Sequence, residues 1–414
     1  MEPARNRLHE HVRARTVTHD PLRLTVVGWI QRTSTTFVPL SVALRLEGPD
    51  ISVDVRGARN VRFFQSEAAG AWHEHDMSHL DATKSRSPLR ATPLGKTGPS
   101  VYPVGLGCMA MSGAYGPAED AEGVATIRRA IERGITLLDT GDFYGNGHNE
   151  LLIRRAIEGM RDKVQLSVKF GAMRGPDGAM VGIDTRPAAV KNFAAYSLQR
   201  LGVEVIDVYR PARLDPQVPI EDTVGAIADL IKAGFVRHIG LSEVGIETIR
   251  RASKVHPIVD LQIEYAIATR GPEASIFPAI AELGMSATLY GVFARGLLTG
   301  SKPSGKGDFR QYMPRFAGEQ GAHNASVVEK LHAFAGERGM TPAQVALAWV
   351  LAKQPTLVPI IGARTRAQLD DALVALDKPL SASDVAALET IVPADAIGGT
   401  RYPAQHMKAL DSER

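Results

Sequence analysis

The sequence predicts an α/β protein built as a (β/α)8 TIM barrel with an N-terminal extension outside the barrel. After residue 100, short and nearly continuous apolar runs recur eight times, and amphipathic helical stretches separate them. Such runs are typical of parallel strands buried on both faces, and eight strand–helix repeats favour a barrel. A doubly wound open sheet is the competing fold. That sheet would more naturally split into two domains, and no linker appears after residue 100.

The eight runs are rich in β-branched and aliphatic residues, which favour strands. The predicted strands cover residues 101–107, 136–140, 164–170, 205–209, 236–242, 258–265, 286–292 and 357–361.

The helix predictions rest on apolar periodicity together with start and stop residues. Four stretches end just before a glycine, at which a helix stops without steric cost: 121–133, 188–201, 220–233 and 274–283. A fifth helix opens at Thr341-Pro342 and runs to Lys353, because proline is favoured in the first turn. One longer insertion, residues 299–324, follows the seventh strand.

The first part of the chain differs in character, and we divide the chain into an extension, 1–84, and a barrel domain, 85–414. No lysine precedes Lys84, and the first 76 residues show no sustained helical or strand period. The extension is interpreted as a disordered segment without catalytic function, with Met77 as a plausible alternative start. A small accessory domain or a targeting arm is the other interpretation, although Glu2 and Glu10 argue against a transit peptide.

Composition narrows the function classes. The 414 residues carry 48 basic and 45 acidic side chains, a formal net charge of +3, so no strong field favours nucleic acid or an anionic membrane. The single cysteine, Cys108, excludes an intrachain disulfide, and no stretch approaches 18 uninterrupted apolar residues. We therefore expect a cytoplasmic protein without a membrane span.

Ionisable residues lie at the ends of the second and third predicted strands, and a barrel carries its active site at such strand ends. Asp139 and Tyr144 follow the second strand, and Lys169 lies at the end of the third. A lysine ammonium beside a phenol would lower its pKa, and an aspartate would keep the lysine charged and oriented. We expect a tuned general acid able to protonate a developing alkoxide. We assign no metal ligands.

Five segments resemble the aldo-keto reductase family over about residues 90–395. Asp139-Thr140-x-x-x-Tyr144-Gly145 with Asn149-Glu150 is similar to the family's second-strand signature, and Lys169 falls where its lysine lies. The other matching segments are Gly240-Leu241-Ser242-Glu243, Gln262 with Glu264-Tyr265, Tyr290-Gly291-Val292-Phe293 ahead of Gly296, and Pro359 to Thr365 with Gln368. The surrounding sequence also resembles the pyridoxal reductase branch.

The resemblance implies a bound nicotinamide cofactor. Tyr290 would stack on the nicotinamide ring, and Ser242 and Gln262 would hold its carboxamide. Arg364 would pair with the 2′-phosphate, which favours NADPH/NADP+ over NAD. The remaining cofactor-binding residues that the resemblance implies are Met109, Glu243, Gly291, Phe293, Gly296, Gly362, Gln368 and Asp371.

A second possible nucleotide motif is excluded. Gly105-Leu106-Gly107-Cys108-Met109-Ala110 formally fits the dinucleotide fingerprint after a strand. That fingerprint requires a helix to start at once and receive the pyrophosphate. Residues 112–117 intervene instead, so no Rossmann-type site is predicted.

The fourth strand departs from the family pattern. Most aldo-keto reductases end this strand with a histidine that hydrogen-bonds the substrate carbonyl, and the matching position here is Ala212, with Arg213 and Asp215 fitting the pattern after it. Three interpretations remain open. The alanine makes room for a bulkier carbonyl compound, Arg210 or Arg213 replaces the missing donor, or the protein binds NADPH with little turnover.

The leading hypothesis is an NADPH-dependent reductase of aldehydes and ketones with Asp139, Tyr144 and Lys169 as the catalytic set and pyridoxal as a possible substrate. The alternative is a regulatory protein that senses NADPH. We expect substrate specificity to depend on loops 109–117, 299–324 and 394–406. The sequence leaves the substrate and the oligomeric state open.

Overall fold

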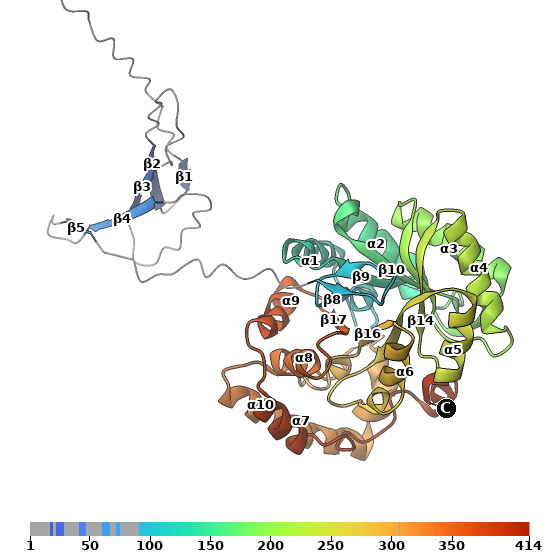
Figure 1. Ribbon diagram of the computed structural model, residues 1–414. Coiled ribbons are helices and arrows are strands. Elements are labelled where there is room, and N and C mark those ends of the chain that lie inside the picture. Colours follow the sequence, from blue (N-terminus) through green and yellow to red (C-terminus); the bar gives the residue numbers. More distant parts are fainter. Residues whose placement is uncertain are drawn as a thin grey trace, which may run out of the picture. The chain divides into compact units, whose positions relative to one another are not determined.

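The computed structural model describes residues 91–305 and 307–413, together with the backbone of five strands nearer the N-terminus. The chain divides into two compact units, Met1–Ser87 and Pro88–Arg414. The second unit holds the barrel and the candidate site (Figure 1).

Eight parallel strands close into a barrel, as the sequence predicts. They follow one another around the barrel in chain order, and β17 closes onto β8. The strands are β8 (Gly105–Gly107), β9 (Leu137–Gly141), β10 (Gln165–Phe170), β13 (Ile206–Pro211), β14 (Val236–Ser242), β15 (Ile258–Glu264), β16 (Ser286–Tyr290) and β17 (Val358–Gly362). Every residue of β9, β13 and β15 is buried, including the polar side chains that these strands carry among their apolar residues.

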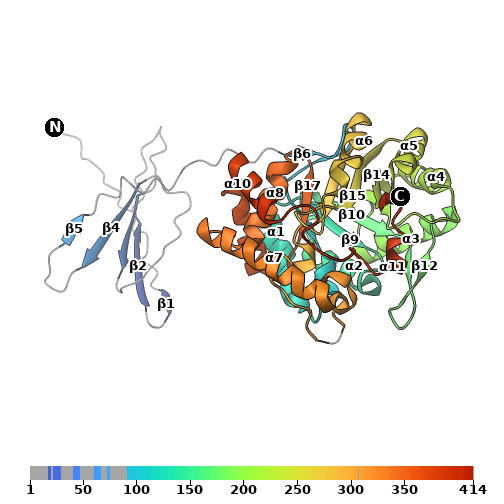
Figure 2. The same cartoon turned by 90° about the horizontal axis from the view of Figure 1, so that it is seen from below.

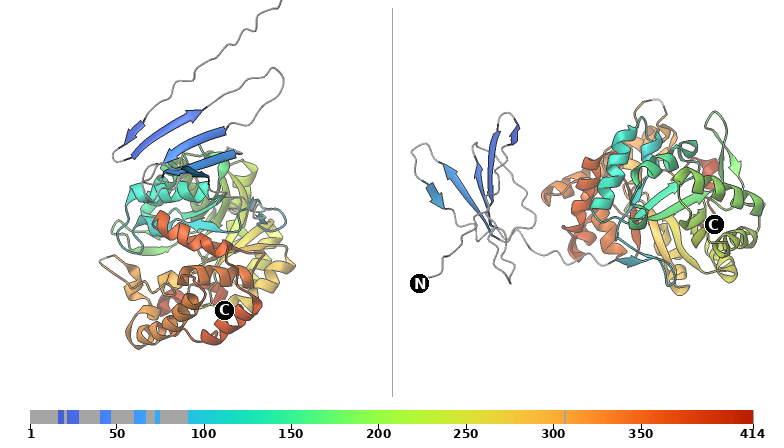
Figure 3. Two further views of the ribbon diagram at one scale, coloured as in Figure 1. Left: turned by 90° about the vertical axis from the view of Figure 1, so that its left-hand side faces the viewer. Right: turned by 90° about the horizontal axis from the view of Figure 1, so that it is seen from above.

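Helices surround the barrel and cover its outer face, as the views along different directions show (Figures 2 and 3). The described helices are α1 (Asp120–Glu132), α2 (His148–Ala156), α3 (Pro187–Leu201), α4 (Ile220–Lys232), α5 (Ile246–Val255), α6 (Ile276–Glu282), α7 (Gly318–Glu337), α8 (Pro342–Lys353), α9 (Arg366–Leu373), α10 (Ala382–Ile391) and α11 (Ala404–Met407). The predicted ends are confirmed at Gly202, which adopts φ of 67° after α3, and at Thr341, whose side chain caps α8 in a capping box.

A short hairpin covers the N-terminal end of the barrel. Strands β6 (Thr92–Pro93) and β7 (Ser100–Val101) pair antiparallel, and Leu94 and Val101 pack against Val208 and Val259 of the barrel interior. The first predicted strand, 101–107, was therefore too long. Its first residue belongs to the hairpin, and the barrel strand begins at Gly105.

The predicted insertion after β16 is only partly a loop. Residues 299–317 contain the short helical turns η6 (Phe309–Tyr312) and η7 (Pro314–Phe316), and α7 already begins at Gly318. A second hairpin, β11 (Ala172–Arg174) with β12 (Met180–Ile183), follows β10 and was not predicted.

The N-terminal unit contains a five-stranded sheet in the order β1-β2-β3-β4-β5. Its strands are β1 (Val17–His19), β2 (Leu22–Gly28), β3 (Ser41–Leu46), β4 (Asn60–Ser66) and β5 (Trp72–Glu74). The expectation of a chain without strand pattern does not hold for these segments. The rest of the extension, 1–84, lies outside the described residues.

Over the described part of the chain, no helix has both the length and the apolar composition to span a membrane.

Candidate active site

An ion pair lies inside the barrel near the carboxyl ends of its second and third strands. Lys169 Nζ lies 2.5 Å from Asp139 Oδ1, and both side chains are almost fully buried. Ser167 Oγ and Gln262 Nε2 each donate a hydrogen bond of 2.8 Å to the other carboxylate oxygen, Asp139 Oδ2. Since both oxygens are bound, the carboxylate is fixed and holds the lysine in place.

Tyr144 lies in the helical turn that follows β9, beside this pair. Lys169 Nζ is 5.0 Å from the centre of the Tyr144 ring, and the ring of Phe143 meets Tyr144 edge to face at 4.8 Å. The structure thus brings together the three residues that the sequence analysis selected. The Tyr144 hydroxyl makes no hydrogen bond to a described residue.

The electrostatics of the phenol differ from the sequence-based expectation. Burial, followed by the charge of Asp139, raises the pKa of Tyr144 well above its usual value of 10. Burial also lowers the pKa of Lys169, although the negative charge of Asp139 acts to raise it. Desolvation outweighs the expected help from the lysine, because both groups are enclosed. Tyr144 therefore keeps its proton at neutral pH, as a general acid must.

A second ion pair lies deeper in the barrel. Arg210 Nη1 is 2.9 Å from Asp260 Oδ2, both side chains are fully buried, and Thr288 Oγ1 donates to the same oxygen at 2.7 Å. Arg210 Nη2 donates to Ser167 Oγ at 3.0 Å, which connects this pair to Asp139. Arg210 is thus committed to Asp260 and is not available to a substrate.

The residues predicted to hold the nicotinamide lie at or near the ends of neighbouring strands. Ser242 is the last residue of β14, and Tyr290 is the last residue of β16. Gln262 lies between them in β15. Its amide nitrogen is used by Asp139, and its amide oxygen accepts no hydrogen bond from a described residue. The oxygen is the part of Gln262 that a carboxamide can still use.

Glu243, which the family resemblance assigns to the cofactor, is surrounded by hydrogen-bond donors of the protein itself. It adopts φ of 52°. Its carboxylate accepts hydrogen bonds from both terminal guanidinium nitrogens of Arg401, at 3.0 and 2.9 Å. Ser412 Oγ and Tyr290 Oη donate to it as well. Burial alone would raise the pKa of Glu243, but Arg401 lowers it to about 2. This carboxylate therefore fastens the C-terminal segment to the barrel.

The residues predicted for the adenosine end lie around the start of α9. Arg364 precedes the helix cap Thr365, and its backbone N–H donates to Gln368 Oε1 at 2.9 Å. A side chain at Gly362 would meet no atom within 4 Å, so space is open there. Asp371 faces away from this space, because its carboxylate accepts from Thr341 Oγ1 and Gln344 Nε2 at the start of α8.

The loop after β16 approaches the loop after β8 across the strand ends. Phe309 stacks on Tyr115 with ring centres 5.3 Å apart. Arg310 forms a buried ion pair with Asp308. Earlier in the loop, the turn from Gly291 to Gly296 carries Phe293, and Gly291 has φ of 73°. A Cβ there would lie 2.9 Å from the Glu264 side chain, so only glycine fits. Met109 opens the turn after β8.

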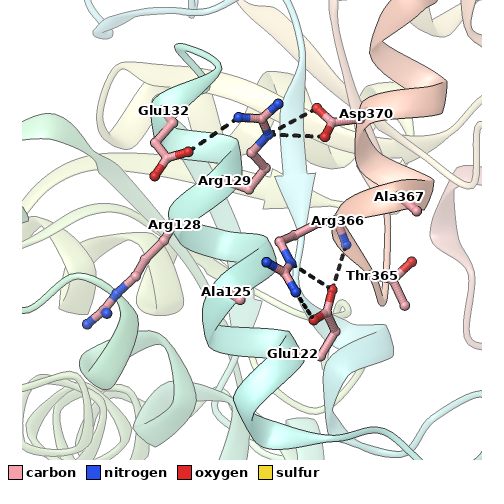
Figure 4. A pocket seen from close by; sticks show the side chains of 9 residues that line it. All are labelled: Glu122, Ala125, Arg128, Arg129, Glu132, Thr365, Arg366, Ala367 and Asp370. Atoms are coloured by element: carbon pink, nitrogen blue, oxygen red, sulfur yellow. Dashed lines mark hydrogen bonds and ion pairs between the residues drawn. The ribbon is translucent and has the colours of Figure 1, made fainter. Parts of the chain in front are cut away.

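A groove on the outer surface separates α1 from α9 (Figure 4). Two ion pairs join the helices along it, Arg366 with Glu122 at 2.9 Å and Arg129 with Asp370 at 3.1 Å. These pairs are partly exposed and contribute little stability. Their effect is positional, since they hold the first turn of α9 and hence the place of Arg364.

Position 212 lies where β13 ends, next to the catalytic strands. Ala212 is buried and its N–H donates to Phe170 O at 2.8 Å. The following residue, Arg213, reaches Tyr402, with Nη2 at 3.4 Å from the Tyr402 hydroxyl. Tyr402 in turn lies 3.1 Å from Tyr290 Oη. The sequence analysis named the loop 394–406 but not Tyr402, because no periodicity or motif marks that residue.

Comparisons with known proteins agree with this geometry. The model of the aldo/keto reductase family matches residues 103–393. A curated relative from Glycine max, named "Probable aldo-keto reductase 1", is 38% identical over 327 residues, which is 77% of this chain and 93% of the relative.

Solved structures show the same fold. The glycerol dehydrogenase AKR11B4 from Gluconobacter oxydans matches with a TM-score of 0.67 at 27% identity, covering 75% of this chain and 98% of that one. The holo form of aldo-keto reductase AKR11C1 from Bacillus halodurans matches with a TM-score of 0.61 at 26% identity, covering 74% and 97%.

The chain belongs to the aldo/keto reductase family. It is accordingly an oxidoreductase of the class that reduces small carbonyl compounds with a nicotinamide cofactor.

Proposed function

We propose that this protein reduces aldehydes and ketones to alcohols with NADPH as the reductant and Tyr144 as the general acid. The observation that carries the proposal is the Tyr144–Lys169–Asp139 arrangement at the strand ends, with the lysine 5.0 Å from the phenol ring and 2.5 Å from the carboxylate.

The residues at the strand ends fit the cofactor. Ser242 and Tyr290 end β14 and β16, and Gln262 of the intervening β15 is level with Ser242, so that a nicotinamide could be held there. When bound, the reduced nicotinamide supplies a hydride to the carbonyl carbon. Tyr144 then needs to supply only a proton to the carbonyl oxygen, and its raised pKa keeps that proton available at neutral pH.

The preference for NADPH rests on Arg364. Among the described residues no carboxylate forms an ion pair with its guanidinium, which donates a hydrogen bond to the carbonyl oxygen of Tyr115 at 3.2 Å. A dianionic 2′-phosphate would give this cation its missing charge partner. The neighbouring Arg366 is already paired with Glu122.

The first test measures reduction of a panel of carbonyl compounds that includes pyridoxal, methylglyoxal and nitrobenzaldehyde. The readout is the loss of NADPH absorbance. In Tyr144→Phe we expect kcat to fall about 10²- to 10⁴-fold, the usual worth of a general acid, with unchanged NADPH affinity by fluorescence. Tyr196→Phe is the matched control, since that tyrosine is 50% exposed on α3. NADPH binding without turnover of any compound would favour the regulatory alternative.

The cofactor preference has its own test. Arg364→Gln should weaken NADPH binding by about 10- to 100-fold, since a hydrogen bond to a charged group contributes about 1.5–3 kcal/mol, and should leave NADH binding unchanged. Arg250→Gln, at a partly exposed arginine of α5 that pairs with Glu282, should change neither affinity. Equal weakening of both cofactors in Arg364→Gln would contradict a 2′-phosphate contact.

A further inference from the structure

Position 212, directly after β13, offers no side-chain donor to a reacting carbonyl. Ala212 occupies that position with a methyl group, and its N–H is already bound to Phe170 O. Tyr144 would therefore give its proton to an oxygen that has no second hydrogen-bond donor from this strand. Loss of one preorganised donor to a developing oxyanion typically costs about 10²- to 10³-fold in rate.

The guanidinium of Arg213 lies beside this position. Its Nη1 donates to the carbonyl oxygen of Ala212 at 2.6 Å, which folds the side chain back toward the residue before it. On the other side, Nη2 lies 3.4 Å from the Tyr402 hydroxyl, and the guanidinium carbon is 5.8 Å from the ring centre of Tyr402. These contacts engage one hydrogen on each terminal nitrogen and leave others for a ligand.

Arg213 differs from the other arginines around the strand ends. Arg295 pairs with Glu264 at 2.8 Å, and Arg401 pairs with Glu243 at 2.9 Å. Within residues 91–305 and 307–413, no carboxylate forms an ion pair with Arg213. Arg213 is half-buried, and without an ion-pair partner its charge remains available to an electron-rich group of a ligand.

Arg213 is also within electrostatic range of the general acid. It works to lower the pKa of Tyr144, against the larger effects of burial and Asp139. Burial disfavours the charge of Arg213 itself, yet Tyr402, Tyr290 and Glu243 raise its pKa above the usual value. The guanidinium is thus charged at every working pH.

We propose that Arg213 is a catalytic residue that donates a hydrogen bond to the substrate carbonyl oxygen, in the place that Ala212 leaves without a donor. The inference rests on the proposed function. As a hydride adds to the carbonyl carbon, the π-electron pair of the C=O bond moves onto oxygen, and Tyr144 supplies the proton that neutralises it. Arg213 stabilises the negative charge and keeps all of its protons.

The proposal has a pH signature. Arginine does not titrate in the neutral range, whereas an imidazole in this place would titrate near pH 6.5. The wild-type rate should therefore show no ionisation between pH 6 and 8 that depends on position 212 or 213. A variant that uses a histidine donor should acquire one.

The experiment compares Arg213→Met, Arg213→Lys and the double variant Arg213→Met with Ala212→His. We expect Arg213→Met to lower kcat about 10²- to 10³-fold with KM, NADPH affinity and melting temperature little changed. Lysine should recover part of kcat. The double variant should recover at least about tenfold and gain a rate dependence near pH 6.5.

Arg186→Met is the matched control, because Arg186 is 72% exposed, pairs with Asp184, and lies before α3 on a loop that leaves the same end of the barrel. It should leave kcat unchanged. If Arg213→Met fails to fold, Arg213→Lys and Ala212→His alone still decide the question, since a second donor should add little to a site that already has one.

Two outcomes would overturn the inference. One is an unchanged kcat in Arg213→Met while Tyr144→Phe is inactive, which leaves the reductase function intact. The other is a loss confined to KM for 4-carboxybenzaldehyde and absent for 4-methylbenzaldehyde, which would make Arg213 a binder of anionic substituents. Absence of turnover in the wild type would instead contradict the proposed function itself.

Discussion

Asp142 carries the clearest prediction for stability. It follows β9 directly, is 8% exposed, and lies near Glu150, which is fully buried. Arg200 Nε bonds Glu150 Oε2 at 2.5 Å, but Asp142 Oδ1 and Glu150 Oε1 have no hydrogen-bond partner in the described structure. Burial, with the charge of Glu150, raises the pKa of Asp142 from 3.8 to about 7.

The magnitude follows from this shift. A difference of about 3 pKa units at about 1.4 kcal/mol each corresponds to about 4 kcal/mol. Between pH 4 and 7 the folded protein binds a proton at Asp142 that the unfolded chain does not. The contribution of this carboxyl group therefore makes the protein less stable as pH rises through that window, and it is constant above pH 7.

Asp142→Asn should remove this dependence, because the amide does not titrate. From pH 5 to pH 8 the wild type should lose about 3 kcal/mol more unfolding free energy than the variant, since about two of the three units fall in that interval. The assay is urea unfolding of both proteins at the two pH values. Carboxyl groups remote from Asp142 contribute equally to both proteins and cancel in the comparison.

Asp308→Asn is the control for this comparison. Arg310 holds the pKa of Asp308 at about 2, so its stabilising effect is fully present at both pH 5 and pH 8. That variant should lose the same free energy at the two pH values. If Asp142→Asn also shows the wild-type pH dependence, the buried carboxyl pair does not control stability and the reasoning fails.

Two further substitutions test interactions of the barrel. Arg210→Met should destabilise the protein by about 3–5 kcal/mol in urea unfolding, because it leaves Asp260 charged and buried, and adding Asp260→Leu should recover most of that loss. Asp411→Ala should cost about 1 kcal/mol in the same assay, since it removes the acceptor of Gly245 N and Thr248 Oγ1 at the start of α5. An unchanged midpoint in either single variant would contradict the assigned contact.

The barrel could be predicted because its strands are buried on both faces. A strand such as 286–290 is mostly apolar, and that pattern is visible without any partner. The missed helices lack equally clear signals. Helix α5 ends at Val255 without a following glycine, and α7 begins at Gly318, a residue that ordinarily indicates a loop.

The clustering of the candidate catalytic residues could be predicted for a similar reason. Asp139 and Tyr144 lie within one short segment, and Lys169 ends the next strand, so the topology alone brings them together. The contact of Glu243 with Arg401 joins residues 158 positions apart. It depends on how the C-terminal segment returns to the strand ends, which no local pattern specifies.

The upward shift of the Tyr144 pKa shows the limit of reasoning from neighbouring charges alone. A lysine near a phenol lowers the pKa of the phenol only where its charge outweighs the desolvation of the phenol. Here Lys169 is enclosed and its charge is already opposed by Asp139, so the phenol receives little benefit and keeps its proton. The charge that is free to act lies elsewhere, on Arg213, which has no carboxylate partner in the described structure. We propose that this guanidinium, which directly follows Ala212, stabilises the oxyanion that Tyr144 protonates.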